Sequence, residues 1–135
     1  LDRFLEAVFR DTPLPISVKT RLGLERSEEF PAILEVLNRY PIKELTIHPR
    51  IRAQFYKGSV DMEVFRYAME HSKNPLCYNG DLRTVAEVRQ LEERFPAVDA
   101  VMIGRGAVAD PALLRKLRGG EAATKEELQA FLQDF

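Results

Sequence analysis

Four short apolar segments alternate with amphipathic helical patterns along the chain, and this alternation limits the folds open to it. We expect strands at residues 16–22, 45–47, 75–78 and 98–103. They recur at intervals of roughly 25–30 residues, the size of a βα repeat. Strands that alternate with helices in this way predict an α/β fold with a parallel sheet and right-handed crossovers.

The last apolar segment ends in Gly104-Arg105-Gly106, after which a helical pattern begins. In that pattern Asp110 is the expected N-cap and Pro111 the first helical residue. Glycines between a strand and a helix let backbone N–H groups approach a phosphate, and Arg105 adds a positive charge. The same residues also fit an ordinary turn that needs two glycines, so the motif alone leaves both interpretations open.

Capping residues mark further helix starts, and the two ends of the chain lie within helical patterns. The expected caps are Ser27, Asp61, the Thr84–Glu87 capping box and the Thr124–Glu127 capping box. Gly119-Gly120 separates the last helix from the βα series. Because both ends look cut, we interpret the chain as a piece of a longer protein.

Composition excludes several classes of function. The net charge of −1 gives no overall positive field, so any contact with nucleic acid must come from a local patch. A single cysteine rules out an internal disulfide framework, and the spacing of the cysteine and the two histidines matches no metal site. We see no membrane span and no signal peptide, and we expect a cytoplasmic protein.

Polar side chains gather where each predicted strand ends. They are Lys19 and Arg21, then His48 and Arg50, then Asn79 and Asp81, then Arg105. In a (β/α)₈ barrel the active site lies at this end of the strands, and the last two βα loops commonly bind phosphate. Structural roles remain open for each residue: a snorkelling lysine, a satisfied histidine, an Asn-Gly turn or an aspartate cap.

Taken together, four segments resemble the successive strand-end motifs of the tRNA-dihydrouridine synthases. They are Ile16-Ser-Val-Lys-Thr-Arg-Leu-Gly23, Leu45-Thr-Ile-His-Pro-Arg50, Tyr78-Asn-Gly-Asp81 and Val101-Met-Ile-Gly-Arg-Gly106. The resemblance implies the C-terminal half of an FMN-binding (β/α)₈ TIM barrel, with strands five to eight. Residues 1–120 would form this half-barrel, and residues 121–135 would begin a C-terminal helical domain.

The resemblance also implies roles for single residues. Lys19 and His48 match residues that contact the flavin ring, where a cation stabilises the reduced, anionic flavin. Asn79, Gly80 and Asp81 match the segment that holds the ribityl chain and phosphate, and Gly104 and Arg105 match the phosphate-binding pair. Further candidates lie in the loop after His48, where RNA would bind. The RNA-binding candidates are Arg50, Arg52, Tyr56 and Lys57.

The implied function is the flavin-dependent reduction of uridine to 5,6-dihydrouridine in tRNA, with NADPH as reductant. The resemblance places the acid cysteine in the missing N-terminal half-barrel, so this chain supplies no catalytic residue of its own and Cys77 is not given that role. We expect the chain to be inactive alone and to form a homodimer that covers its unpaired edges. Two alternatives are another FMN-dependent barrel of the dihydroorotate-dehydrogenase type and a half-barrel without catalysis.

Overall fold

The computed structural model describes residues 1–134 and divides into two compact units. Unit 1 comprises Leu1–Gly80 and Ala97–Met102, and unit 2 comprises Asp81–Pro96 and Ile103–Phe135. These bounds differ from the half-barrel and helical stub expected at 1–120 and 121–135. That domain boundary stays a prediction, and residue 135 lies outside the described residues.

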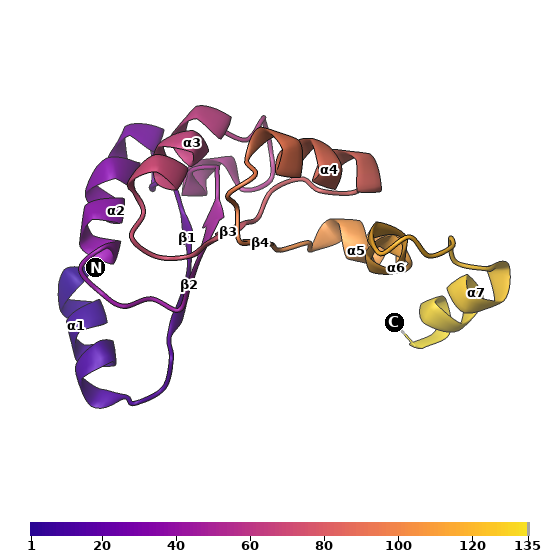
Figure 1. Ribbon diagram of the computed structural model, residues 1–135, viewed down its shortest axis with the longest axis horizontal. Helices are drawn as coiled ribbons and strands as arrows, with labels where there is room; N and C mark the ends of the chain where they lie inside the picture. The colour runs from indigo at the N-terminus through magenta and orange to yellow at the C-terminus, as the bar shows by residue number, and fades with distance from the viewer. Residues whose placement is uncertain (135) are drawn as a thin grey trace. The chain divides into compact units, whose positions relative to one another are not determined.

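Within residues 1–134, unit 1 carries a four-stranded parallel sheet in the order β1-β2-β3-β4 (Figure 1). The strands are β1 (Ser17–Arg21), β2 (Glu44–His48), β3 (Leu76–Tyr78) and β4 (Ala100–Val101). Consecutive strands that pair side by side in parallel are the arrangement of successive βα units in a TIM barrel. The predicted fold class, an α/β partial barrel, is therefore confirmed.

Helices separate the strands as predicted. Unit 1 contains α1 (Asp2–Asp11), the 3₁₀ turn η1 (Ser27–Glu29), α2 (Phe30–Leu37), the 3₁₀ turn η2 (Arg52–Gln54) and α3 (Met62–His71). Unit 2 contains α4 (Val85–Arg94), α5 (Arg105–Ala109), α6 (Leu113–Leu117) and α7 (Lys125–Asp134). Asp61 caps α3 through the N–H of Val64, and Thr84 with Glu87 caps α4.

Two predicted helix starts are wrong. Ser27 begins a 3₁₀ turn rather than an α-helix, because the Glu29 carboxylate accepts the backbone N–H groups of residues 24–26 and shapes the turn. Asp110 does not begin the helix after the glycine motif, since α5 already begins at Arg105. Asp110 instead accepts the N–H of Ala112 at 3.2 Å, just before α6.

Strand β4 is shorter than predicted because side chains take over its pairing with β3. The Asp99 carboxylate accepts the N–H of Leu76 at 2.8 Å, and the Asn79 amide donates to the carbonyl of Met102 at 2.8 Å. Backbone bonds from Asp99 and Met102 to β3 flank the two residues of β4. The apolar run at 98–103 is thus held against β3, but only its centre is a strand.

The register of the sheet shows which side chains lie on each of its two faces. Lys19, Thr46, Cys77 and Ala100 lie opposite one another in neighbouring strands and so share one face. The opposite face carries Leu45 and Ile47, both fully buried, and the ring of Tyr78, which packs edge-on against Phe65 of α3 at 4.9 Å. Helices α2 and α3 also contact each other (Figure 1). The core of unit 1 therefore lies on the helix-facing side of the sheet.

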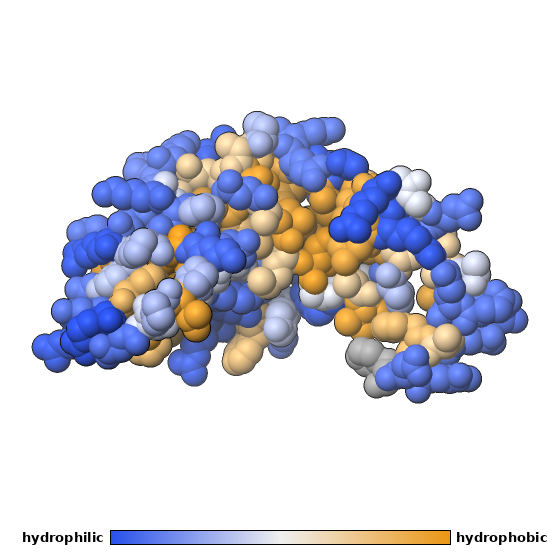
Figure 2. Space-filling view, turned by 60° about the horizontal axis from the view of Figure 1, so that its bottom comes forward, coloured by the Kyte–Doolittle hydropathy of each residue, from blue (hydrophilic) through white to orange (hydrophobic). Residues whose placement is uncertain are grey.

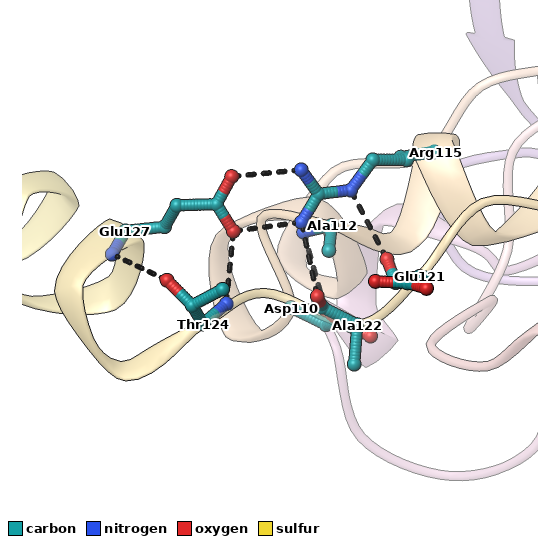
Figure 3. A network of polar contacts seen from close by, with 7 residues as sticks. All are labelled: Asp110, Ala112, Arg115, Glu121, Ala122, Thr124 and Glu127. Atoms are coloured by element: carbon teal, nitrogen blue, oxygen red, sulfur yellow. Dashed lines mark hydrogen bonds and ion pairs between the residues drawn. The ribbon is translucent and has the colours of Figure 1, made fainter.

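Unit 2 has its own small core and a C-terminal segment held by one arginine. Its buried apolar side chains are Leu82, Val88, Leu91, Phe95, Ala112 and Leu113. Arg115 of α6 forms a double ion pair with Glu127 of α7 and donates to the carbonyls of Glu121 and Ala122 (Figure 3). The predicted capping box of Thr124 and Glu127 is present within this network.

The surface mixes charged side chains with exposed apolar ones (Figure 2). The exposed large apolar residues include Phe4, Leu14, Phe55, Tyr56, Met102, Val108 and Leu132. No helix within residues 1–134 has the length and apolar character needed to cross a bilayer.

Candidate functional site

The candidate site residues at the strand ends of unit 1 lie on one face of the sheet, towards the carboxyl ends of its strands. Lys19, Thr46 and Cys77 form one row across β1, β2 and β3. Two residues further along, Arg21 pairs with His48, and Asn79 follows directly after β3, where its N–H still bonds to β2. Alternation along the extended backbone places all three on the same face. The sheet therefore places three of the predicted site residues, Lys19, His48 and Asn79, on one face.

Lys19 is an exposed cation on this face. Partial burial of the ammonium, and next the positive charge of Arg21, lower the pKa of Lys19 below its ordinary value, while the neighbouring Cys77 acts in the opposite direction. An open depression beside β1 is lined by Lys19, Arg21 and Arg52 together with Glu29. Three cations around one depression make it suitable for an anionic group.

His48 is buried, with 5% of its surface exposed, and Arg50 lies beside it. The Arg50 side chain is 1% exposed, and its Nη1 lies 3.2 Å from Nε2 of His48. The Nε and Nη2 groups of Arg50 donate to the carbonyl of Gly58 at 3.2 and 2.6 Å. The structure thus places Arg50 inside the loop rather than on its surface, and its contact with RNA stays a prediction.

The loop of residues 51–58, which we call the β2 loop, folds back on the loop after β1. The N–H groups of Arg52 and Ala53 donate to the carbonyls of Gly23 and Leu24 at 2.8 and 3.1 Å, and Arg21 donates to the carbonyl of Ile51 at 3.0 Å. Phe55 has a φ of 50° and Gly58 a φ of 72°. Positive φ is rare for a bulky residue, so the backbone at Phe55 is strained.

Three RNA-binding candidates, Arg52, Tyr56 and Lys57, are exposed on the β2 loop. The Tyr56 ring also faces inward: its centroid lies 6.2 Å from that of His48, and the Arg21 guanidinium lies 5.6 Å from it. Phe55 is exposed as well, at 67%. Sequence reasoning missed Phe55, although an aromatic residue within a polar loop is a signal for such a role.

Asn79 and Gly80 continue from β3. The N–H of Asn79 donates to the carbonyl of Ile47 at 2.9 Å, and the Asn79 side-chain amide donates to the carbonyl of Met102. A Cβ on Gly80 would overlap the ring of Tyr78, so a side chain at this turn would have to displace that ring. Both residues therefore have a structural role in addition to the flavin contact that we predicted.

Unit 2 brings Asp81 and Arg105 together. Arg105 Nη2 donates to the Asp81 carboxylate at 2.6 Å, and both side chains are partly exposed. Gly104 has open space where a Cβ would stand, with no atom within 4 Å among the described residues, whereas a Cβ on Gly106 would overlap the carbonyl of Leu82. Of the two glycines in the motif, Gly104 leaves its backbone open to a ligand and Gly106 serves packing.

Cys77 is buried in the middle of β3. Burial raises the pKa of the Cys77 thiol, and the hydrogen bond from Thr46 only partly opposes this. Such a thiol stays protonated and is shielded from reagents. Among residues 1–134, no group of three or more His, Cys, Asp and Glu side chains is placed to bind a metal ion.

Comparison with known proteins decides the family. The family model described as dihydrouridine synthase (Dus) matches residues 1–133 of the chain. This chain belongs to the dihydrouridine synthase family. The match extends over residues of both units and includes every candidate residue described above.

Several curated proteins similar to this chain carry the name tRNA-dihydrouridine synthase. A probable tRNA-dihydrouridine synthase of Rickettsia bellii (strain RML369-C) is 33% identical over 116 residues, covering 85% of this chain and 35% of the relative. One from Rhizobium leguminosarum bv. phaseoli is 35% identical over 125 residues, covering 92% and 39%. The tRNA-dihydrouridine synthase B of Pseudomonas aeruginosa is 31% identical over 136 residues, covering 95% and 41%. The chain thus spans 35–41% of the length of these relatives.

Proposed function

We propose that the chain is part of an FMN-dependent tRNA-dihydrouridine synthase, an oxidoreductase that reduces uridine in tRNA to 5,6-dihydrouridine. The observation that carries this proposal is the shared face of Lys19, His48 and Asn79 at the strand ends, in a chain whose family matches over residues 1–133. Family membership favours this function over that of a dihydroorotate-dehydrogenase-like barrel or a half-barrel without catalysis.

The donor set of each unit fits a flavin mononucleotide. In unit 1, the Lys19 ammonium suits the negative charge of a reduced flavin ring, and the Asn79 amide suits polar groups of the ribityl chain. In unit 2, the Arg105 guanidinium and the open backbone of Gly104 suit a phosphate, with Asp81 orienting the arginine. When bound, FMN supplies hydride transfer to the uracil, and NADPH is the proposed source of the electrons.

The chain's own residues would bind and position the RNA. Arg52 and Lys57 carry exposed positive charges suited to the phosphates of tRNA, and Tyr56 offers a ring against which an extruded base can stack. Phe55 adds a second exposed ring. Lys19 would hold its positive charge at the face where negative charge develops during the reduction.

We propose that Cys77 does not protonate the uracil. The buried thiol of Cys77, whose pKa is raised, is a poor proton donor to a substrate because the substrate cannot reach it. We propose that the acid cysteine comes from an N-terminal half-barrel outside this chain. The chain alone is then expected to form no dihydrouridine, and turnover by the isolated chain would contradict this division of roles.

Flavin titration tests the proposal directly. FMN and riboflavin would be titrated into the chain, with quenching of flavin fluorescence as the readout. Lys19→Met should weaken both ligands, whereas Arg105→Ala should weaken FMN by about tenfold or more and leave riboflavin unchanged, because only FMN carries a phosphate. Arg118→Ala is the matched control, since Arg118 is an exposed arginine of unit 2.

Two results of these titrations would contradict the proposal. If Arg105→Ala weakens FMN and riboflavin equally, Arg105 does not bind the phosphate. If neither the chain nor the longer protein that contains it binds flavin, the flavin-dependent function is wrong.

We also propose that the isolated chain self-associates. Strands β1 and β4 are the edges of the sheet in unit 1, and open edges pair with other strands. Light scattering at micromolar concentration should give the mass of a dimer, and a stable monomer would overturn this expectation.

A further inference from the structure

Arg50 is among the largest fully buried side chains of residues 1–134. Its guanidinium joins two separate parts of unit 1: Nη1 meets Nε2 of His48 at 3.2 Å, while Nε and Nη2 converge on the carbonyl of Gly58. Two donors on one carbonyl and a third on a ring nitrogen use the planar fork of arginine, which lysine cannot reproduce.

The contact with His48 indicates which ring nitrogen carries the proton. Arginine has five donors and no acceptor, and it stays protonated in proteins. For Nη1 to donate to Nε2, the ring nitrogen must offer a lone pair. His48 is then neutral, with its proton on Nδ1, because a proton on Nε2 would face the N–H of Arg50 donor to donor.

The contact with Gly58 closes the β2 loop. Arg50 stands just before this loop, and Gly58, at its far end, has a φ of 72°. Between them lies Phe55, whose strained φ of 50° persists only where the surroundings hold the backbone. The Arg50 fork supplies such a restraint from the buried side of the loop.

We propose that Arg50 is a positioning residue, which holds His48 as the neutral Nδ1–H tautomer and locks the β2 loop over it. The role of these groups towards flavin and RNA rests on the function proposed above, but the tautomer and the loop restraint do not. A neutral His48 adds no positive charge to the face it shares with Lys19. The ring of His48 would therefore contribute shape and hydrogen bonding, and Lys19 the charge.

Nitrogen-15 NMR of the histidine-labelled chain at pH 7.5 tests the tautomer without any ligand. The chain has two histidines, so a His71→Gln spectrum assigns both. We expect His48 to show a protonated Nδ1 and an unprotonated Nε2. In Arg50→Met the Nε2–H form should appear at His48. A wild-type His48 protonated on Nε2 would overturn the proposal.

His71 provides the internal control. It is exposed on α3, and its Nδ1 donates to the carbonyl of Tyr67 at 2.9 Å, independently of Arg50. Its signals should be the same in the wild-type chain and in Arg50→Met. If Arg50→Met shifts both histidines alike, or leaves the His48 tautomer unchanged, Arg50 does not set the tautomer.

Hydrogen exchange tests the loop. In Arg50→Met, amides within the β2 loop should exchange about tenfold faster or more, while those of β2 and the centre of α3 keep their protection. Arg50→Lys should show the same release of the loop, since one ammonium lacks the fork. If Arg50→Met fails to fold, the wild-type tautomer and the Arg50→Lys exchange pattern still decide. Loss of flavin binding with an intact tautomer would count against the proposed function and not against this role of Arg50.

Discussion

Two arginines tether chain segments in this protein by the same chemistry in opposite surroundings. Arg50 of unit 1 is buried at 1% exposure and donates twice to the carbonyl of Gly58. Arg115 of unit 2 has a side chain that is 44% exposed, and it donates to two carbonyls and to the Glu127 carboxylate (Figure 3). Burial is the variable that separates the two tethers.

The difference teaches which contacts carry stability. A hydrogen bond from a charged group is worth most where water cannot replace it, whereas exposed ion pairs are screened and contribute little. We therefore expect the β2 loop to depend on Arg50. In unit 2, we expect close packing of Gly106 against Leu82, rather than the Arg115–Glu127 pair, to hold the segment after β4.

The largest effect should come from Gly106→Ala. The added Cβ overlaps the backbone of Leu82 and Arg83, and no side-chain rotation relieves this overlap. The free energy of unfolding of unit 2 should therefore fall by about 3 kcal/mol. Gly104→Ala is the matched control, because its Cβ would meet open space; it should change stability by less than about 0.5 kcal/mol. Urea unfolding followed by circular dichroism measures both, and equal effects of the two changes would refute the packing argument.

Arg50→Met should have the second-largest effect and lower the free energy of unfolding by about 2 kcal/mol, because the Gly58 carbonyl loses hydrogen bonds from a charged donor. The loss should be nearly the same at 0.05 and 1 M salt, since a buried group is poorly screened. A loss that fades in high salt would show that Arg50 behaves like a surface charge and would remove the contrast with Arg115.

Arg115→Ala should lower the free energy of unfolding by less than Arg50→Met does, and high salt should make this loss smaller still. The residue is exposed, and its partner Glu127 is also 48% exposed. Urea unfolding at low and high salt makes the comparison. An effect as large as that of Arg50→Met would mean that exposure does not separate the two tethers.

The smallest effect should be a pH dependence of α7. Arg115, and then the N–H of Thr124, lower the pKa of Glu127 from its ordinary 4.5 to about 2. Because the folded pKa is depressed, this stabilisation is fully present above pH 4.5 and is lost as the pH falls from 4.5 towards 2. Helicity measured by circular dichroism should drop in this window, and Glu127→Gln should remove that part of the change.

Much of the fold followed from local pattern. The βα alternation predicted four parallel strands, and the capping signals at Asp61, Thr84 and Thr124 are confirmed, because a cap is satisfied by residues three positions away. The prediction of an α-helix N-cap at Ser27 was wrong, because the carboxylate of nearby Glu29 accepts the backbone N–H groups in front of Ser27. Strand β4 was overestimated because its pairing depends on Asp99 and Asn79 meeting β3.

In the candidate site, too, some features could be predicted from the sequence and others could not. The placement of Lys19, His48 and Asn79 on one face follows from strand ends and alternation, which sequence shows. The burial of Arg50 does not, because an arginine in a polar loop is usually solvated and only its contact with Gly58, eight residues away, reverses this. The roles of all these residues towards flavin and RNA stay predictions.

The pleat of the sheet has a consequence for how such a chain can change in length. Lys19, His48 and Asn79 share a face only because each stands at the right parity in its strand. Inserting or deleting one residue within β2 would exchange the sides of His48 and Ile47, so that the polar ring would lie among the helices and the apolar side chain on the opposite face. The same change within residues 51–58 would leave the parity of the strands unchanged, although it would disturb the contact between Arg50 and Gly58. Length variation that preserves this shared face therefore belongs outside the strands.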